Sequence, residues 1–268
     1  MARFRPRPTF GPQSFACIGD SHTFNLSYLT EPEYWPALVA GRLGWPYINA
    51  SVSGNSSGQV YSRRRLLVAK DLPHKAVIYV GTNDLNAAPV VAASPVPSST
   101  VFAIDTGEGY YVADSWITVG GVSAQIASIS SKTITLTAAL AGGAPSAGAA
   151  VRLDTQKNIE KTVAYLKAQG MAAADIYVCG QHYLNFTSSG DTTTVEQTLA
   201  HTTRLAQAAA ATAQGVTFID LYAYMRALIL SCAYTQGSAS WHIANQNSHL
   251  NAIGQQILAD AIYAAVGP

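Results

Sequence analysis

Short apolar runs separated by longer amphipathic stretches dominate the chain. Five of these runs are bounded by Gly, Pro or polar residues, a pattern typical of strands that are buried on both faces of a parallel sheet. The runs are Ser14–Ile18, Tyr47–Asn49, Ala76–Val80, Asp175–Cys179 and Thr217–Asp220.

Amphipathic helices are predicted between and after these runs. One covers Asp154–Gln169, with apolar residues on one face. A second begins at the capping box formed by Thr193 and Glu196 and reaches Gly215. The last spans Leu250–Val266, with apolar residues at helical spacing. Strands that alternate with such helices predict a three-layer α/β/α sandwich around a parallel sheet, with right-handed crossovers.

Residues 88–153 interrupt this alternation, because they show no helical periodicity. Pro, Ser and Gly gather at 93–99 and at 141–148, which predicts linkers into and out of an insertion. We therefore divide the chain into an α/β domain of residues 1–87 and 154–268 and an inserted β-rich accessory module of residues 88–153.

Within the module, apolar and polar residues alternate with a period of two, which predicts short antiparallel strands. Hairpin turns are predicted at Gly120-Gly121 and at Ser130–Lys132. Insertions at the carboxyl ends of parallel strands commonly contact substrate, so we expect the module to lie near a site. The alternating stretches are Trp116–Val119, Gln125–Ile129 and Thr133–Thr137.

Composition narrows the function classes. The formal net charge is +1 and charged residues make up 12%, without the basic stripe that nucleic-acid binding requires. No apolar run approaches the length of a membrane span. The basic N-terminus lacks the apolar stretch of a signal peptide, so we expect cytoplasmic synthesis, which a virion component would share. Cys17, Cys179 and Cys232 are predicted to be buried free thiols with no zinc-site spacing.

The candidate chemistry begins at Gly19-Asp20-Ser21-His22, directly behind the first apolar run. A Gly at this point permits a tight turn, and the following helix would aim free N–H groups at the serine. A Gly-Asp-Ser triplet alone is more often a plain turn or helix cap.

Three further polar motifs strengthen the case for a site. Gly54 follows the second apolar run, Asn83 follows the third, and His249 precedes the last helix. Because the first two motifs follow parallel strands, we expect all of them to converge with Ser21 on one crevice. A serine, a base and fixed N–H donors are what acyl transfer requires.

In this set and order, the motifs make the chain similar to the SGNH hydrolases, also called the GDSL esterase family. The resemblance covers the α/β domain and leaves the module outside it. It implies a flavodoxin-like fold and a serine esterase that needs no metal or organic cofactor. It also implies that Ser21 is the nucleophile and His249 the base. The oxyanion hole would consist of the N–H groups of Ser21 and Gly54 and the Asn83 amide.

The chain departs from the family pattern at the residue that orients the histidine. The family usually has an Asp three residues before it, where this chain has Gln246. Gln246 and Asn247 are candidates for orienting the imidazole instead. Three interpretations remain: a Ser–His dyad, a carboxylate borrowed from Asp20 or Asp84, or an altered site that only binds.

Several other residues are candidates for contacts with substrate. They are His22, His182 and Trp241, for which packing or a surface position is the alternative. Asp84 is expected to brace its loop. The run Arg63-Arg64-Arg65 is predicted to be a solvated helix face.

The substrate class depends on weaker signals. An amphipathic lid of the kind expected for an interfacial lipase is not visible. Tyr110, Tyr111 and Trp116 of the module suggest a surface on which sugar rings stack. The module also loosely resembles parts of phage tail proteins, and it is a candidate for homo-oligomer or virion assembly. We therefore predict O-deacetylation of a carbohydrate. The alternatives are a small-ester or lipid esterase, and a non-catalytic glycan-binding or virion structural module.

Overall fold

The computed structural model describes residues 13–24, 29–67, 72–85, 88–182, 195–231, 242–243 and 246–267. A parallel sheet of five strands, in the order β10-β9-β3-β1-β2, forms its centre. All five predicted apolar runs contribute a strand to it. The strands are β1 (Phe15–Gly19), β2 (Tyr47–Asn49), β3 (Lys75–Tyr79), β9 (Ile176–Cys179) and β10 (Thr217–Ile219).

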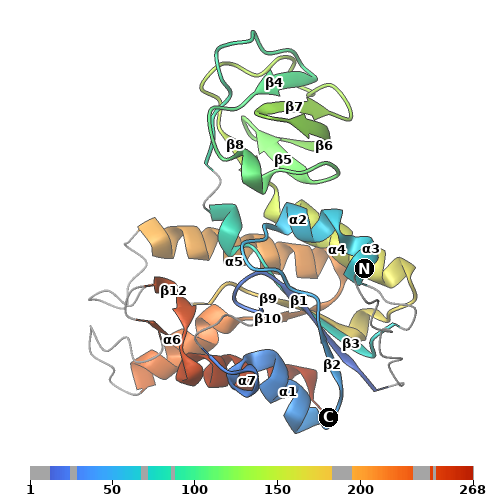
Figure 1. Cartoon of the computed structure of the whole chain (residues 1–268), viewed down its shortest axis with the longest axis vertical. Helices are drawn as coiled ribbons and strands as arrows, with labels where there is room; N and C mark the ends of the chain where they lie inside the picture. The colour runs from blue at the N-terminus through green and yellow to red at the C-terminus, as the bar shows by residue number, and fades with distance from the viewer. Residues whose placement is uncertain are drawn as a thin grey trace, which may run out of the picture.

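Helices cover both faces of this sheet, which confirms the predicted three-layer α/β fold (Figure 1). On one face lie α1 (Trp35–Leu43), α6 (Leu221–Ser231) and α7 (Ala252–Val266). On the other lie α2 (Ser57–Ser62), α3 (Arg64–Leu67), α4 (Thr155–Ala168) and α5 (Val195–Gln214). The 3-10 turns η1 (Glu31–Glu33), η2 (Thr82–Leu85) and η4 (Ala173–Asp175) complete the domain.

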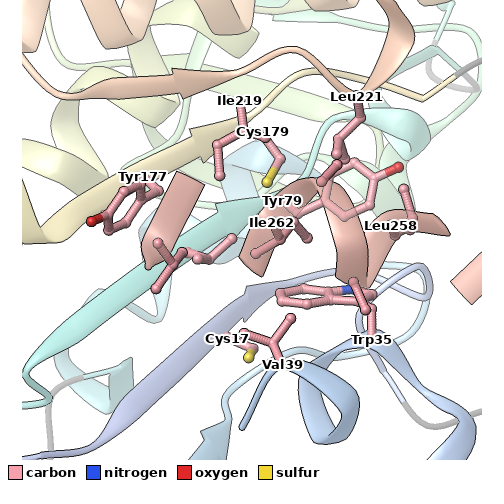
Figure 2. Close-up of a cluster of buried hydrophobic side chains, with 14 of the residues drawn as sticks. Cys17, Trp35, Val39, Tyr79, Tyr177, Cys179, Ile219, Leu221, Leu258 and Ile262 are labelled. Atoms are coloured by element: carbon pink, nitrogen blue, oxygen red, sulfur yellow. The ribbon is translucent and has the colours of Figure 1, made fainter. Parts of the chain in front are cut away.

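Two hydrophobic cores, one on each face of the sheet, hold these layers together. The core under α1, α6 and α7 contains Trp35 of α1 and Tyr79 of β3 (Figure 2). Cys17 and Cys179 are buried free thiols in this core, as predicted, and burial raises the pKa of each. Cys232 lies outside the described residues.

The module is a separate antiparallel sheet with the strand order β4-β7-β6-β5-β8. The turns at Gly120-Gly121 and Ser131-Lys132 join its strands as predicted, and both Gly120 and Gly121 have positive φ. A third core, including Phe102 and Ile126, fills the module. The elements are β4 (Val101–Ala103), η3 (Glu108–Tyr110), β5 (Trp116–Val119), β6 (Val122–Ser130), β7 (Thr133–Leu136) and β8 (Val151–Leu153).

The predicted linkers are in fact loops inside the module. Val91, which precedes the stretch 93–99, is buried in the module core and bridges to Ile104. Strand β8 likewise follows the stretch 141–148. Composition alone marks such segments as irregular, but it does not show which side of them the core begins on.

The last helix begins two residues later than predicted. Leu250 belongs to β12 (Gln246–Leu250), which pairs with β11 (His242–Ile243). The Asn251 side chain accepts a hydrogen bond from the Gly254 N–H at 3.1 Å and so caps α7. The apolar spacing of Leu250 had suggested a helical position, but the cap sets the boundary. The capping box predicted at Thr193 lies outside the described side chains.

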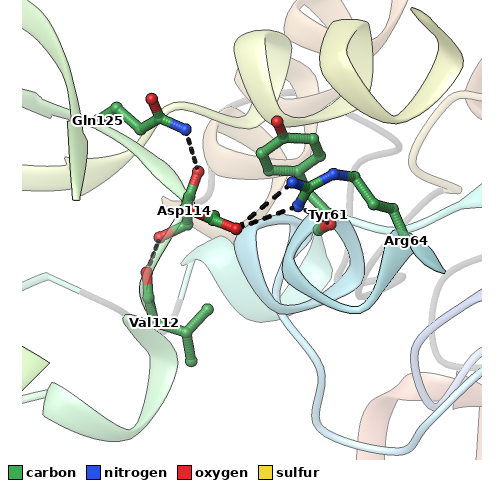
Figure 3. A network of polar contacts seen from close by, with 6 residues as sticks. Tyr61, Arg64, Val112, Asp114 and Gln125 are labelled. Carbon is green, nitrogen blue, oxygen red and sulfur yellow. Dashed lines mark hydrogen bonds and ion pairs between the residues drawn. The ribbon is translucent and has the colours of Figure 1, made fainter. Parts of the chain in front are cut away.

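The module contacts α2, α3 and α4 through polar groups. Asn158 of α4 and the backbone of Trp116 exchange two hydrogen bonds, of 2.8 and 3.0 Å. Arg64 of α3 lies over the Tyr61 ring and forms an ion pair with Asp114 at 3.4 Å (Figure 3). These contacts hold the module against the helices that follow the loops of the site.

Candidate active site

Ser21 and His249 meet at the carboxyl edge of the parallel sheet. Ser21 follows β1, His249 lies on β12, and 228 positions separate them in sequence. Their side chains are nevertheless in hydrogen-bond contact, with 2.9 Å between His249 Nε2 and Ser21 Oγ. Burial lowers the pKa of His249, so its imidazole is neutral near pH 7 and able to accept a proton. The pair therefore has the geometry of a nucleophile and its general base.

The turn that presents Ser21 depends on Gly19. A Cβ at this position would lie 2.2 Å from the Tyr79 carbonyl oxygen and 2.6 Å from Thr23 Oγ1. Any side chain here would push β1 away from its neighbour β3 or displace the turn. The glycine of the motif is thus required by the close approach of backbone.

Asp20, between Gly19 and Ser21, is buried beside the pair. Its Oδ1 accepts a hydrogen bond from the His22 N–H at 3.0 Å, and its Oδ2 has no hydrogen-bond partner within the described part of the chain. Burial, with a smaller contribution from the charge of Asp84, raises the pKa of Asp20 to about 7. This carboxyl therefore shapes the turn and carries only part of a negative charge at neutral pH.

The two predicted oxyanion residues lie on loops that flank Ser21. The strands β2 and β3, which precede them, both pair with β1. Gly54 has a φ of 78°, a conformation that favours glycine. The Asn83 Nδ2 donates to the Asn55 carbonyl oxygen at 3.0 Å and so ties the two loops together. An amide carries a second N–H on the same nitrogen, which can serve a substrate oxygen.

Asp84 braces the same region. Its two carboxylate oxygens accept hydrogen bonds from the Ser57 N–H at 2.8 Å and from Thr155 Oγ1 at 2.6 Å. It thereby links η2 to the starts of α2 and α4. With both oxygens engaged in these bonds, Asp84 fits the bracing role better than that of a partner for His249.

The position of Arg63 shows that its predicted place on a solvated helix face is wrong. It is half-buried rather than part of a solvated helix face, because α2 ends at Ser62 and the chain turns Arg63 inward. Its guanidinium donates to Asn55 Oδ1 at 2.8 Å, to the Ala50 carbonyl at 2.6 Å and to the Gly19 carbonyl at 3.3 Å. Arg63 thus supports both the serine turn and the Gly54 loop, and no spacing in the sequence distinguishes it from Arg64 and Arg65.

His22 and His182 lie beside the pair, but both side chains are buried. The His22 ring stacks on the His249 ring, with 4.9 Å between centroids and 22° between planes. The His182 ring meets the other edge of this cluster, 4.7 Å from His22. In this structure His22 packs on His249 and His182 packs on His22, and a surface position for His182 is wrong. Trp241 and the side chains of Gln246 and Asn247 lie outside the described residues, so their roles stay predictions.

Comparison with known proteins shows the family of this chain. The GDSL-like lipase/acylhydrolase family matches residues 17–257. The chain belongs to this family of carboxylic ester hydrolases. No curated protein matches the sequence.

Several solved structures share the fold. An acetyl xylan esterase superposes with a TM-score of 0.60 at 16% identity, over 95% of this chain and 100% of that one. An acetylxylan esterase from Geobacillus stearothermophilus gives 0.59 at 16% identity, over 96% and 94%. A lipase/acylhydrolase from Enterococcus faecalis gives 0.55 at 15% identity, over 95% of each chain. At such identities the likeness shows the fold alone.

The described residues contain no group of three or more His, Cys, Asp or Glu side chains that could hold a metal ion. In the same part of the chain, no helix has the length and hydrophobicity needed to cross a membrane.

Proposed function

We propose that this GDSL-family hydrolase removes O-acetyl groups from a carbohydrate, with Ser21 as nucleophile and His249 as general base. The 2.9 Å contact between His249 Nε2 and Ser21 Oγ is the main support for these catalytic roles. A protein that only binds glycans needs no such contact, so it argues against the non-catalytic alternative.

The reaction proceeds in two displacements. Ser21 Oγ attacks the ester carbonyl carbon while its proton passes to His249 Nε2. The N–H groups of Ser21 and Gly54 and the amide of Asn83 receive the negative charge on the carbonyl oxygen. The C–O bond to the sugar breaks, and the sugar oxygen takes the proton from His249. Water then attacks the acyl-serine while losing a proton to His249. The bond between the acyl carbon and Ser21 Oγ breaks, Oγ takes the proton from His249, and acetic acid leaves and ionises to acetate in solution.

The proposed substrate has two kinds of support. The first is the fold shared with two acetylxylan esterases. The second is the position of the module turn η3: Ser56 Oγ donates to the Tyr110 carbonyl at 2.9 Å, and Gln59 Nε2 to the Gly109 carbonyl at 3.0 Å. Ser56 follows Gly54 by two residues, so its bond to Tyr110 supports a role for this half-exposed ring near the Gly54 loop.

The other two aromatic residues contribute less to this surface. Tyr111 is buried in the module core, so its predicted role in stacking on a sugar is wrong. Trp116 packs near the Nζ atoms of Lys157 and Lys161, each 5.6 Å from a ring centroid. The resemblance of the module to phage tail proteins stays a prediction from sequence alone.

A lipid or small-ester esterase is the second candidate function. The fold shared with the lipase/acylhydrolase from Enterococcus faecalis favours it. It differs from the first candidate in the acyl chain that the enzyme accepts, which gives a direct test.

The test is hydrolysis of p-nitrophenyl esters of increasing chain length, followed by acetate release from acetylated xylan. The proposal predicts fastest turnover on the acetate ester and free acetate from the polysaccharide. It predicts losses of at least about 10³-fold for Ser21→Ala and His249→Ala. Preference for the octanoate ester would favour the lipid esterase. Equal rates for the wild type, both variants and buffer would contradict an esterase.

A further inference from the structure

The His249 imidazole has a second contact besides Ser21, and it involves a residue outside the family's catalytic set. His22, directly after the nucleophile, stacks on the His249 ring at a centroid distance of 4.9 Å. The interplanar angle of 22° leaves the two rings nearly parallel. Two aromatic faces in this arrangement restrict rotation of the ring about its own bonds.

His22 is itself held in place from several sides. Its N–H donates to Asp20 Oδ1 at 3.0 Å, and its carbonyl accepts from Trp35 Nε1 at 3.1 Å. Its ring lies 4.7 Å from that of His182 and 5.8 Å from that of Tyr79. The Tyr79 hydroxyl is in turn hydrogen-bonded to His182 Nδ1. The groups that titrate around His22 are thus Asp20, Tyr79, His182 and His249.

This cluster is almost fully buried. The exposed fractions of His22, His182 and Tyr79 are 1%, 0% and 1%. An uncharged aromatic ring whose face meets a cation stabilises that cation. During attack by Ser21, His249 becomes such a cation.

We propose that His22 is a positioning residue that holds the His249 imidazole by stacking and stabilises its cationic form during catalysis. It would supply part of what the family's Asp supplies, at a position where this chain has Gln246. The inference rests on the proposed role of His249 as the base. It goes beyond that role by assigning a function to the residue after the nucleophile.

Two substitutions separate the ring from other properties of His22. His22→Phe keeps an aromatic face without a titrating group, and His22→Leu removes the face. We expect kcat/KM to fall about tenfold in H22L, mainly through kcat, and to stay within about threefold of wild type in H22F. His74→Leu is the control, since His74 packs edge-on against Trp45 before β3, at the opposite end of that strand from Tyr79.

A direct titration of His249 by NMR distinguishes this role from a merely structural one. The pKa of the His249 imidazole should be about one pH unit lower in H22L than in wild type, and nearly unchanged in H22F and H74L. The acid limb of the kcat/KM profile should move in the same direction. If H22L does not fold, H22Q, which has a flat amide but no ring, replaces it.

The outcomes separate this inference from the proposed function. A wild-type protein without esterase activity would contradict the proposed function, while the NMR titration would still test the stacking. Activity and pKa in H22L equal to wild type would overturn the inference alone. Equal losses in H22F and H22L, with the pKa of His249 unchanged, would overturn it as well, because they would show a role in packing only.

Discussion

The α/β domain and the module bury different kinds of side chains. Among the described residues, every buried polar or charged side chain lies in the α/β domain except that of Ser115, which faces Gly58 of α2. The module core is apolar apart from the hydroxyl of Tyr111. Burying polar groups costs free energy unless they are hydrogen-bonded, so proteins concentrate them where they serve a purpose.

This difference indicates that the α/β domain carries the proposed chemistry and that the module is a separately packed accessory unit. Asp20, Ser21, His22 and His182 meet at the carboxyl edge of the parallel sheet, where the chemistry is proposed. The module contributes a self-contained core and touches the α/β domain mainly through polar groups, such as the Arg64–Asp114 pair in Figure 3. Catalysis should therefore depend on single residues of the α/β domain. The attachment of the module to that domain should depend on the contacts between them.

Among substitutions that leave Ser21 and His249 in place, the largest effect should come from Asn83. Asn83→Ala removes the proposed oxyanion donor, and kcat should fall by about 10²–10³-fold. The matched control is Gln125→Ala in the module, which removes an exposed amide whose Nε2 donates to the Asp114 carbonyl at 3.0 Å. Steady-state kinetics on p-nitrophenyl acetate compares them. Equal losses of kcat in the two variants would contradict the assignment of catalysis to the α/β domain.

The buried carboxyl of Asp20 should make stability depend on pH. Its pKa of about 7 lies above the ordinary value of 3.8, so the native state keeps a proton that the unfolded state releases between these values. The free energy of unfolding should therefore fall by roughly 2–4 kcal/mol as the pH rises from about 4 to 7.

Asp20→Asn should remove this component of the pH dependence, whereas Asp114→Asn, at an exposed carboxyl of the module, should leave it in place. Denaturant unfolding at pH 4.5 and pH 7.5 gives the comparison. A D20N protein with the full pH dependence of wild type would show that the component arises elsewhere.

A smaller effect is expected where the module rests on α2. A Cβ at Gly58 would lie 2.6 Å from the Ser115 Cβ, so Gly58→Ala should destabilise the protein by about 1–3 kcal/mol. Gly41→Ala in α1 is the control, because no atom lies within 4 Å of its added Cβ. That variant should gain up to about 1 kcal/mol from helix propensity. Thermal unfolding measures both, and a gain in both would mean that the module is not pressed against α2.

The smallest effect concerns the ion pair between the two regions. The Asp114 side chain is 54% exposed and lies 3.4 Å from Arg64. Asp114→Asn removes the charge but keeps a residue type that tolerates the φ of 71° at this position, and it should therefore cost less than about 1 kcal/mol. A larger loss, or one that persists in 1 M salt, would indicate that this contact matters more to docking than its exposure suggests.

The sequence predicted the features that repeat or stand at fixed positions. The apolar runs marked all five parallel strands, and alternation marked the hairpin turns of the module. Serine, glycine, asparagine and histidine motifs in a family order pointed to one edge of the sheet. Contacts between distant segments were beyond such patterns. Neither the inward turn of Arg63 nor the stacking of His22 on His249 follows from local spacing.

The most direct test of the Ser21–His249 pair is covalent labelling by a fluorophosphonate probe, followed by intact-mass measurement and peptide mapping. An activated Ser21 should take up a single adduct in the wild type. Labelling should be lost in Ser21→Ala and strongly slowed in His249→Ala. Absence of an adduct on Ser21 in the folded wild type, or labelling at an equal rate without His249, would contradict a working Ser21–His249 pair.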